Sequence, residues 1–213
     1  MVIATHLIGT PSRRVITGFV LLVVAAIGCL YFALFPGSTP LDRLVEWVLP
    51  NESNSRLLHW IVARGIPGAL VLGAAFSCVL ALFWDRRRAA VCLVAPAVAL
   101  AITEYVMKPL VGRPVPTGDV HGLAYPSGHM AATAAVVAAA ALAVPPCWRK
   151  LAFVIGTGVD VSVAICLILL RYHYATDVLG GAAVAIGATL LIDAALHLLP
   201  ESSLVRTRAA SDR

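Results

Sequence analysis

Six apolar runs, most of them about 20 residues long, recur along the chain and limit what it can fold into. A run of this length spans the hydrocarbon core of a bilayer as an α-helix, because each helical residue adds about 1.5 Å. The chain has 213 residues, of which 60% are hydrophobic and 13% are charged, and a soluble domain of this size cannot bury so much apolar surface. We therefore expect an all-α integral membrane bundle of six transmembrane helices. The runs cover residues 15–35, 66–84, 89–110, 129–144, 151–170 and 178–199.

The basic residues predict how this bundle is oriented. Positive charge gathers in cytoplasmic loops, and with both termini inside, ten of the 16 lysines and arginines lie on the cytoplasmic side. Residues 1–200 then form one multi-pass domain of a bacterial-type plasma membrane, with its motifs between residues 104 and 180, and residues 201–213 form a polar cytoplasmic tail. Between the first two runs, residues 41–49 have apolar side chains at helical spacing, which predicts a short helix on the membrane surface.

Composition also bears on partners and cofactors. The net charge of +5 follows from the basic loops, so we expect the membrane and no nucleic acid as partner. The five cysteines occur singly and form no CxxC pair or Cys/His cluster, which predicts neither disulfides nor a zinc site. No acidic cluster able to hold Mg²⁺ lies near the polar motifs, and we expect no cofactor. The sequence does not predict an oligomeric state.

Three polar segments fall on the outer side of this topology. Charged and polar groups are costly at membrane depth and usually gather around a site, so we expect the bundle to bring these segments together. Lys108, Arg113 and Arg171 supply positive charge and N–H donors, which suit the oxygens of a phosphate group. The segments are KPLVGRP (108–114), YPSGH (125–129) and RYHYATD (171–177).

The other polar residues in these segments suit phosphoryl transfer. Ser127 is placed to cap a helix, and Gly128 lets the backbone approach an anion at that helix N-terminus. His173 and Asp177 are four residues apart, so the carboxylate is expected to hydrogen-bond one imidazole nitrogen and make the other a better nucleophile. His129 then remains to protonate a leaving oxygen.

These motifs resemble the type 2 phosphatidic acid phosphatase (PAP2) superfamily, membrane lipid phosphatases that share an active-site plan with vanadium haloperoxidases. The family pattern has Lys, six residues and Arg-Pro; then Pro-Ser-Gly-His; then Ser-Arg, five residues, His, three residues and Asp. The resemblance extends over roughly residues 60–200. It implies His173 as nucleophile, Asp177 as its partner and His129 as general acid, with Lys108, Ser127 and Gly128 holding phosphate.

The chain departs from this pattern at both arginines. The family spacing puts Val115 and Leu167 where arginines are expected. The available arginines are Arg113, two positions earlier, and Arg171, one helical turn later. We interpret both as relocated phosphate ligands. The alternative is a degenerate site that binds phosphate without turnover.

The predicted function is removal of phosphate from a lipid phosphate or pyrophosphate, of polyprenyl or glycerolipid type, through a phosphohistidine at the outer face of the membrane. The resemblance and the missing metal ligands predict a metal-independent reaction. Two alternatives stay open, a phosphotransferase that uses the same site and a non-catalytic lipid-phosphate binder. Two further pairs are predicted to be structural: Glu104 with Lys108, and Asp193 with His197.

Overall fold

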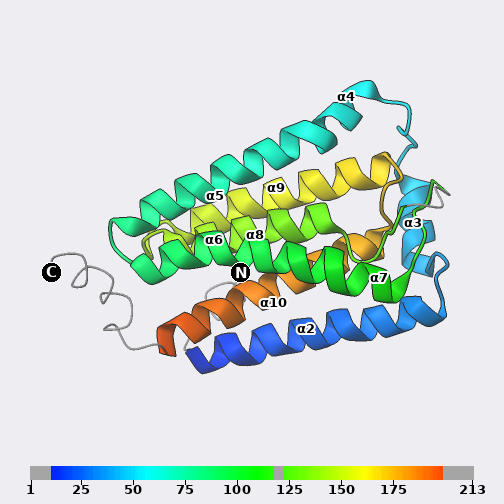
Figure 1. The fold of residues 1–213 in the computed structure, drawn as a ribbon. Helices are drawn as coiled ribbons and strands as arrows, with labels where there is room; N and C mark the ends of the chain where they lie inside the picture. Colours follow the sequence, from blue (N-terminus) through cyan, green and yellow to red (C-terminus); the bar gives the residue numbers. More distant parts are fainter. Residues whose placement is uncertain (1–10, 118–121, 199–213) are drawn as a thin grey trace, which may run out of the picture.

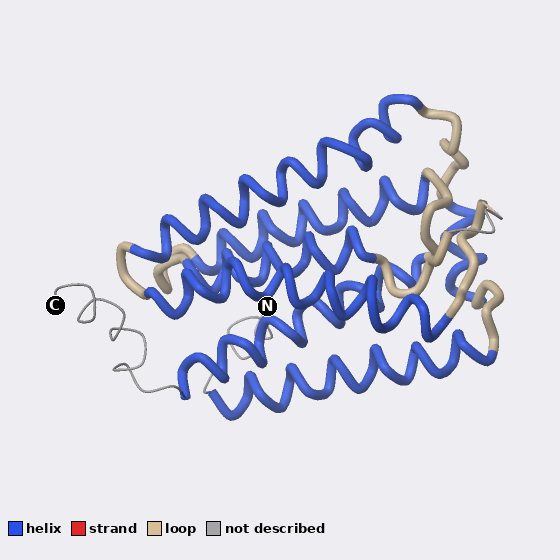
Figure 2. Tube along the Cα trace, viewed as in Figure 1, coloured by secondary structure: helices blue, strands red, loops and turns tan. Residues whose placement is uncertain are grey.

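The computed structural model describes residues 11–117 and 122–198, and most of these residues lie in helices joined by short loops (Figure 2). Within the described residues the one β-type pairing is an isolated antiparallel bridge between Pro114 and Leu123. The all-α expectation is confirmed for this part of the chain, while the expected tail, residues 201–213, lies outside it. The helices are α2 (Pro11–Leu34), α3 (Pro40–Val48), α4 (Arg56–Trp60), η1 (Ile61–Gly65), α5 (Ile66–Leu82), α6 (Arg86–Ala101), η2 (Ile102–Met107), α7 (Lys108–Val111), α8 (Gly128–Ala143), α9 (Arg149–Leu169) and α10 (Ala175–Leu198).

Among the described residues, five helices are long and apolar enough to cross a membrane, which identifies an integral membrane protein. Two of the five are composite, because α4, η1 and α5 run on as one helix, and so do α6, η2 and α7. The sixth expected span forms α8, but this helix has 16 residues and a length of about 24 Å, short of the roughly 30 Å hydrocarbon core. The expected count of six spanning helices is therefore not confirmed.

The second span begins ten residues before the expected start at residue 66. Arg64 and Gly65 interrupt the apolar run, yet they continue the helix as part of the π-helical segment η1. A second π-helical segment, η2, lies just before Lys108. Such segments are rare and occur often at functional sites, and both of these lie toward the polar end of the bundle (Figure 1).

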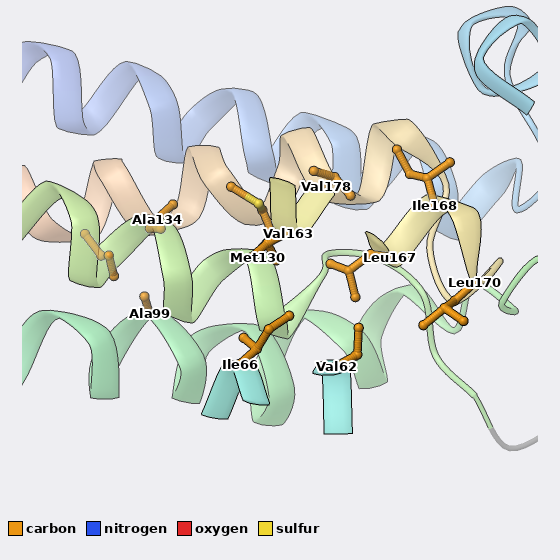
Figure 3. Close-up of a cluster of buried hydrophobic side chains, with 13 residues drawn as sticks. Val62, Ile66, Ala99, Met130, Ala134, Val163, Leu167, Ile168, Leu170 and Val178 are labelled. Atoms are coloured by element: carbon orange, nitrogen blue, oxygen red, sulfur yellow. The ribbon is translucent and has the colours of Figure 1, made fainter. Parts of the chain in front are cut away.

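The short helix α8 and the last helix α10 form the centre of the bundle (Figure 1). Helix α8 packs against α5, α6, α9 and α10, and α10 also packs against α2. Most residues of α8 are alanine, and small side chains allow such close approach of neighbouring backbones. One apolar cluster joins these helices near the polar end (Figure 3). Its labelled members are Val62, Ile66, Ala99, Met130, Ala134, Val163, Leu167, Ile168, Leu170 and Val178.

The two ends of the bundle differ in their polar contacts. At one end the start of α2 meets the end of α10, where Arg14 forms an ion pair with the fully buried Asp193 (Figure 1). His197 contacts the same aspartate, with Nδ1 2.7 Å from its backbone oxygen and 3.6 Å from its carboxylate. At the opposite end lie α3, α7 and the loop that joins α7 to α8 (Figure 1).

Helix α3 is the surface helix expected at residues 41–49. Thr39 begins it with a capping box, in which its hydroxyl accepts the Asp42 N–H and the Asp42 carboxylate accepts the Thr39 N–H. One face carries exposed apolar side chains, with Trp47 84% exposed. The opposite face carries Asp42, which is buried. The helix therefore joins an apolar outer surface to a buried carboxylate.

Helices α2 and α10 cross at a pair of glycines, which generates a first prediction. A Cβ on Gly187 would lie 2.9 Å from the Gly18 carbonyl oxygen, and a backbone oxygen cannot rotate away. Gly187→Ala is therefore expected to lower the free energy of unfolding by about 1–3 kcal/mol, measured by thermal unfolding in detergent.

The matched control is Gly158→Ala in the middle of α9, where no atom lies within 4 Å of the added Cβ. There the substitution is expected to stabilise the protein by about 0.5–1 kcal/mol, because alanine restricts the unfolded chain. Effects of the same sign at both sites would contradict the close crossing of α2 and α10.

Candidate active site

The three polar segments of the sequence meet at one end of the bundle, as expected. The loop after α7 turns back on itself, and the Ala124 N–H donates to the Arg113 carbonyl at 2.8 Å. The same loop then reaches α10, where the Ser127 N–H donates to the Asp177 carbonyl at 3.0 Å. The turn that carries His173 connects α9 to α10 and lies against this loop.

His173 is held by a backbone carbonyl. Its Nδ1 lies 2.9 Å from the carbonyl oxygen of Ala124. A carbonyl oxygen only accepts, so Nδ1 carries the hydrogen and, in the neutral ring, Nε2 keeps its lone pair. The side chain is 6% exposed, which keeps the ring in this position. The neutral tautomer needed for a nucleophilic Nε2 is therefore set by the loop after α7.

Asp177 does not make the expected hydrogen bond with His173. The closest approach between His173 Nδ1 and Asp177 Oδ2 is 3.8 Å, beyond hydrogen-bond range. Asp177 lies in the first turn of α10, and Oδ2 turns back to accept the Tyr174 N–H at 2.7 Å. Its other oxygen accepts from Arg113. This placement corrects the expectation that Asp177 fixes the histidine tautomer, because Ala124 does so instead.

Arg113 is fully buried, and its guanidinium group has no donor left for a phosphate. An arginine has five N–H donors, and here five protein acceptors lie around them. The acceptors are Pro36 O at 3.3 Å from Nε, Thr176 Oγ1 at 2.8 Å and Asp177 Oδ1 from Nη1, and Gly37 O at 3.0 Å and Asp42 Oδ2 at 2.9 Å from Nη2. The rings of Phe32 and Tyr174 cover the guanidinium, with centroids 3.8 and 4.1 Å from Cζ. This geometry speaks against the expectation that Arg113 binds phosphate.

Arg171 lies at the end of α9 and contacts α3. The end of α9 is a Schellman motif, in which the Arg171 N–H bonds Ile168 O and the Tyr172 N–H bonds Leu167 O. Arg171 holds the left-handed position of this motif, with φ +56°, where glycine is usual. Its guanidinium reaches the end of α3, donating to the carbonyls of Glu46 and Leu49, both at 3.1 Å. Arg171 therefore ties α9 to α3 through Nη2, while its Nη1 has no hydrogen-bond partner among the described residues, and its role as a phosphate ligand stays a prediction.

The two positions where the family pattern has arginine are apolar and packed. Leu167 is fully buried and lies in the cluster with Val62 and Met130 (Figure 3). Val115 lies against Gly122 across the isolated bridge, so that a Cβ on this glycine would be 2.9 Å from both Val115 methyl groups. Neither Val115 nor Leu167 therefore offers a group that could bind phosphate in place of the family arginine.

Lys108 lies close to the start of α8, and it is held by Glu104. Its Nζ donates to Glu104 Oε1 at 2.7 Å, which is the predicted pair one turn apart. The carboxylate in turn lies against the backbone of Gly128, where an added Cβ would be 1.9 Å from the same oxygen. Gly128 is therefore required for the close approach of η2 and α8. The lysine side chain keeps 15% of its surface exposed.

His129 follows Gly128 and lies among the other candidate groups. His173, Lys108 and Glu104 are all near enough to act electrostatically on its imidazole, and the ring also hydrogen-bonds the backbone of Val62 in η1. The structure thus brings both histidines and Lys108 into one electrostatic neighbourhood, as the sequence predicted.

Ser127 begins α8 as predicted. Its Oγ accepts the Met130 N–H at 3.3 Å, and its carbonyl accepts the Ala131 N–H at 2.9 Å. The backbone amides of Gly128 and His129 lie between Ser127 and Met130, before the first hydrogen bond of the helix. They have no acceptor within the described chain. They are available to an anion at the positive end of the helix dipole.

Asp42 is the functional-site neighbour that sequence reasoning missed. It is 1% exposed and accepts from Arg113 Nη2, from Thr39 N at 2.9 Å and from the N–H and hydroxyl of Thr176. Burial acts to raise the pKa of Asp42, but the hydrogen bonds from Thr39, Thr176 and Arg113 outweigh it and hold the pKa below its ordinary value. The sequence signal was the Thr-Pro-Leu-Asp capping box, which indicates a helix start and not a long-range partner.

Within residues 11–117 and 122–198, no group of three or more His, Cys, Asp or Glu side chains is arranged to hold a metal ion. The groups that gather at this end are two imidazoles, one lysine and the amides at the start of α8.

The lowered pKa of Asp42 predicts how stability depends on pH. A carboxylate whose pKa is depressed by folding stabilises the protein fully above its unfolded pKa, about 4, and loses this contribution as pH falls through the folded pKa. In detergent, Asp42→Asn is expected to lower the melting temperature at pH 7, and the difference from wild type should shrink below about pH 4. A constant difference from pH 7 to pH 2 would contradict this account.

The left-handed conformation of Arg171 gives another stability prediction. Both Arg171→Gly and Arg171→Ala remove the contacts with α3, but only glycine adopts φ +56° without steric cost. The glycine variant is expected to be more stable than the alanine variant by about 1–2 kcal/mol, measured by thermal unfolding. Equal stability would mean that the turn rearranges once the arginine is removed.

Comparison with known proteins agrees with the motifs. The family model of the PAP2 superfamily matches residues 109–198, from α7 to the end of α10. No curated protein and no solved structure gives a significant match. The matched segment contains both histidines and begins one residue after Lys108. Residues 109–198 are thus similar to the PAP2 superfamily, a family of phosphatases, and this similarity is consistent with action on phosphate esters.

Proposed function

We propose that this protein is a membrane phosphatase that removes phosphate from a lipid phosphate or pyrophosphate through a phosphohistidine on His173. The observation that carries the proposal is the hydrogen bond from His173 Nδ1 to the Ala124 carbonyl. In the neutral ring it leaves the lone pair on Nε2, and His173 and Lys108 both act electrostatically on His129, so that a nucleophile, an acid and a cation are available together for phosphoryl transfer.

The proposed reaction has two steps. In the first, the Nε2 lone pair forms a bond to phosphorus, the ester oxygen departs, and His129 in its protonated form supplies the proton to that oxygen. In the second, water attacks the phosphohistidine, and His129, now neutral, accepts a proton from the water. Free Nε2 is regenerated, and inorganic phosphate leaves. No metal is assigned a role in either step.

Charge on the transferring phosphoryl group has to be stabilised at its equatorial oxygens. We assign this role to Lys108 and to the free amides of Gly128 and His129. Ser127 supports them by capping α8. Arg113 is left out of this set because all of its donors are engaged, and Arg171 because its Nη2 is bonded to the end of α3.

A lipid substrate is proposed because of where these groups lie. They gather at one end of a bundle whose spans are apolar over most of their surface, so a phosphate attached to a lipid reaches them by diffusion in the bilayer. The basic clusters Arg86–Arg88 and Arg149–Lys150 lie toward the other end of the bundle. By the positive-inside rule that end faces the cytoplasm, which favours a site at the outer face and both chain ends at the inner face.

A second candidate, a non-catalytic lipid-phosphate binder, is favoured by one observation. Both arginines of the polar segments are engaged, and the family arginine positions hold Val115 and Leu167. A site with so few cations stabilises a transition state less than a site with three. A phosphotransferase with the same histidines differs only in its acceptor.

The test of the proposal is phosphate release by the detergent-purified protein, in EDTA, from four lipid classes: a polyprenyl pyrophosphate, a polyprenyl-phosphosugar phosphate, phosphatidic acid and phosphatidylglycerol phosphate. We expect release from at least one class and inhibition by vanadate, which adopts the five-coordinate geometry of the transferring phosphorus. His173→Ala should lower kcat about 10³-fold or more, since nucleophile removal costs this much in comparable enzymes. His129→Ala should lower kcat by about 10²–10⁴-fold.

The matched control is His197→Ala at the opposite end of the bundle, which should leave kcat unchanged. Release of phosphate that survives His173→Ala would contradict the phosphohistidine mechanism. Binding of lipid phosphate without release from any class would favour the binder, and release only when an acceptor alcohol is added would favour the transferase.

A further inference from the structure

The carboxylate of Asp42 connects helix α3 to the turn that carries His173 between α9 and α10. Asp42 lies more than 60 positions before the segment that the family model matches. Its Oδ1 accepts the Thr176 backbone N–H at 2.9 Å, and its Oδ2 accepts from Arg113 Nη2 at 2.9 Å. One carboxylate oxygen therefore holds Thr176, three residues after His173, and the other holds Arg113, whose carbonyl holds the loop that contacts His173.

Asp42 caps α10 from a different helix. Thr176 is the second residue of α10, so its N–H has no acceptor within that helix. Asp42 supplies the acceptor, while Asp177 in the third position turns back to the Tyr174 N–H. Two carboxylates thus lie at the positive end of the α10 dipole, where negative charge is favoured. Both are fully buried, and Arg113 lies between them.

Arg113 carries this link to His173 by two routes. Its guanidinium holds Asp177, which fixes the start of α10 directly after the histidine turn. Its backbone carbonyl holds the Ala124 N–H at 2.8 Å, and the Ala124 carbonyl is the group that accepts from His173 Nδ1. Any movement of Arg113 therefore moves the acceptor that sets the histidine tautomer.

We propose that Asp42 is a positioning residue for His173: its charge fixes Arg113, which fixes the Ala124 carbonyl and the start of α10 and so keeps the lone pair on Nε2. The proposal rests on the proposed function, in which Nε2 is the nucleophile. Asp42 itself touches neither substrate nor the reacting atoms. Helix α3, which lies outside the family match, is then part of the catalytic apparatus.

This role differs from helix capping in what it demands of the side chain. Asparagine caps a helix about as well as aspartate, because either side chain offers an oxygen to the free amides. Asparagine is neutral, however, and its –NH₂ group cannot accept from Arg113. Asp42→Asn therefore separates the two roles, whereas Asp42→Ala removes both.

The kinetic test compares these variants with wild type at a temperature well below the melting temperature of each, with the folded fraction checked by gel filtration. We expect Asp42→Asn to lower kcat at least tenfold with KM within twofold, because the substrate-binding groups at the start of α8 are untouched. Asp42→Ala should lower kcat at least as far. The matched control is Glu52→Gln, the same chemical change at an exposed site after α3, which should leave kcat unchanged.

The second readout does not require activity. ¹⁵N spectra of histidine-labelled protein distinguish a ring protonated at Nδ1 from one protonated at Nε2, and the His173→Gln variant identifies the His173 signals. Wild type should give the Nδ1–H form. Asp42→Asn should shift His173 toward the Nε2–H form, which free imidazole side chains prefer, and Glu52→Gln should not.

The outcomes separate this proposal from the proposed function. Loss of kcat together with a changed tautomer in Asp42→Asn supports positioning. Wild-type kcat and tautomer in Asp42→Asn, or a change confined to KM, overturns it and leaves the phosphatase in place. If wild type releases no phosphate from any lipid, the phosphatase fails, and the tautomer shift alone decides whether Asp42 positions His173.

Discussion

The ion pairs of Arg113 with Asp42 and Asp177 are the interaction on which the polar end of this molecule depends. Three fully buried charged side chains carry a large desolvation cost, which is offset only when every polar atom finds a partner in good geometry. Here the five guanidinium donors are all accepted, and the excess negative charge lies at the start of α10. Removal of Arg113 leaves two buried carboxylates without a counter-charge, and removal of either aspartate leaves buried guanidinium donors without an acceptor. The histidine turn, the loop after α7 and helix α3 therefore hold their relative positions together.

The sequence predicted the parts of this structure that follow from apolar length and chain direction. Each apolar run became a helix, and the alternation of helix directions brought the segments at residues 108, 127 and 173 to one end. The run expected at residues 129–144 already has the 16 residues of α8, but hydropathy did not decide whether it spans the membrane, because its small residues fit a buried helix as well as a spanning one. The Glu104–Lys108 pair was predicted because a spacing of four residues within a helix fixes the geometry.

The roles of the charged residues were harder to predict, for a physical reason. A sequence shows that a guanidinium is present but not which acceptors surround it, and Arg113 and Arg171 were both assigned to phosphate on charge alone. Asp177 is four residues from His173, a spacing that suggests a contact on one helix face. The helix starts only after His173, so Asp177 occupies the third helical position and turns back to the chain instead. Nothing in the sequence indicated that Asp42 is more than a polar residue of a surface helix, because its partners Arg113 and Thr176 lie 71 and 134 residues away.

In the proposed mechanism the phosphate is held mainly by the peptide backbone. Lys108 shares its charge with Glu104, and the remaining donors are the first amides of α8. Helix amides are fixed in direction and need no reorganisation when charge develops, which is an advantage in a site of low dielectric. Such a site depends more on the exact seating of α8 than a site with flexible cationic side chains. The contact between Gly128 and Glu104 sets that seating.

The distribution of the buried ion network along the chain also bears on biosynthesis. Asp42 follows the first span, Arg113 follows the third, and Asp177 begins the last. The residues are synthesised in that order, so Asp42 and Arg113 lack Asp177 as a partner until α10 has been inserted. In the proposed mechanism, the network that positions His173 is complete only when the final helix is in place. A half-inserted chain would then have its imidazoles without the contacts proposed to fix the tautomer, and activity would arise only at the end of assembly.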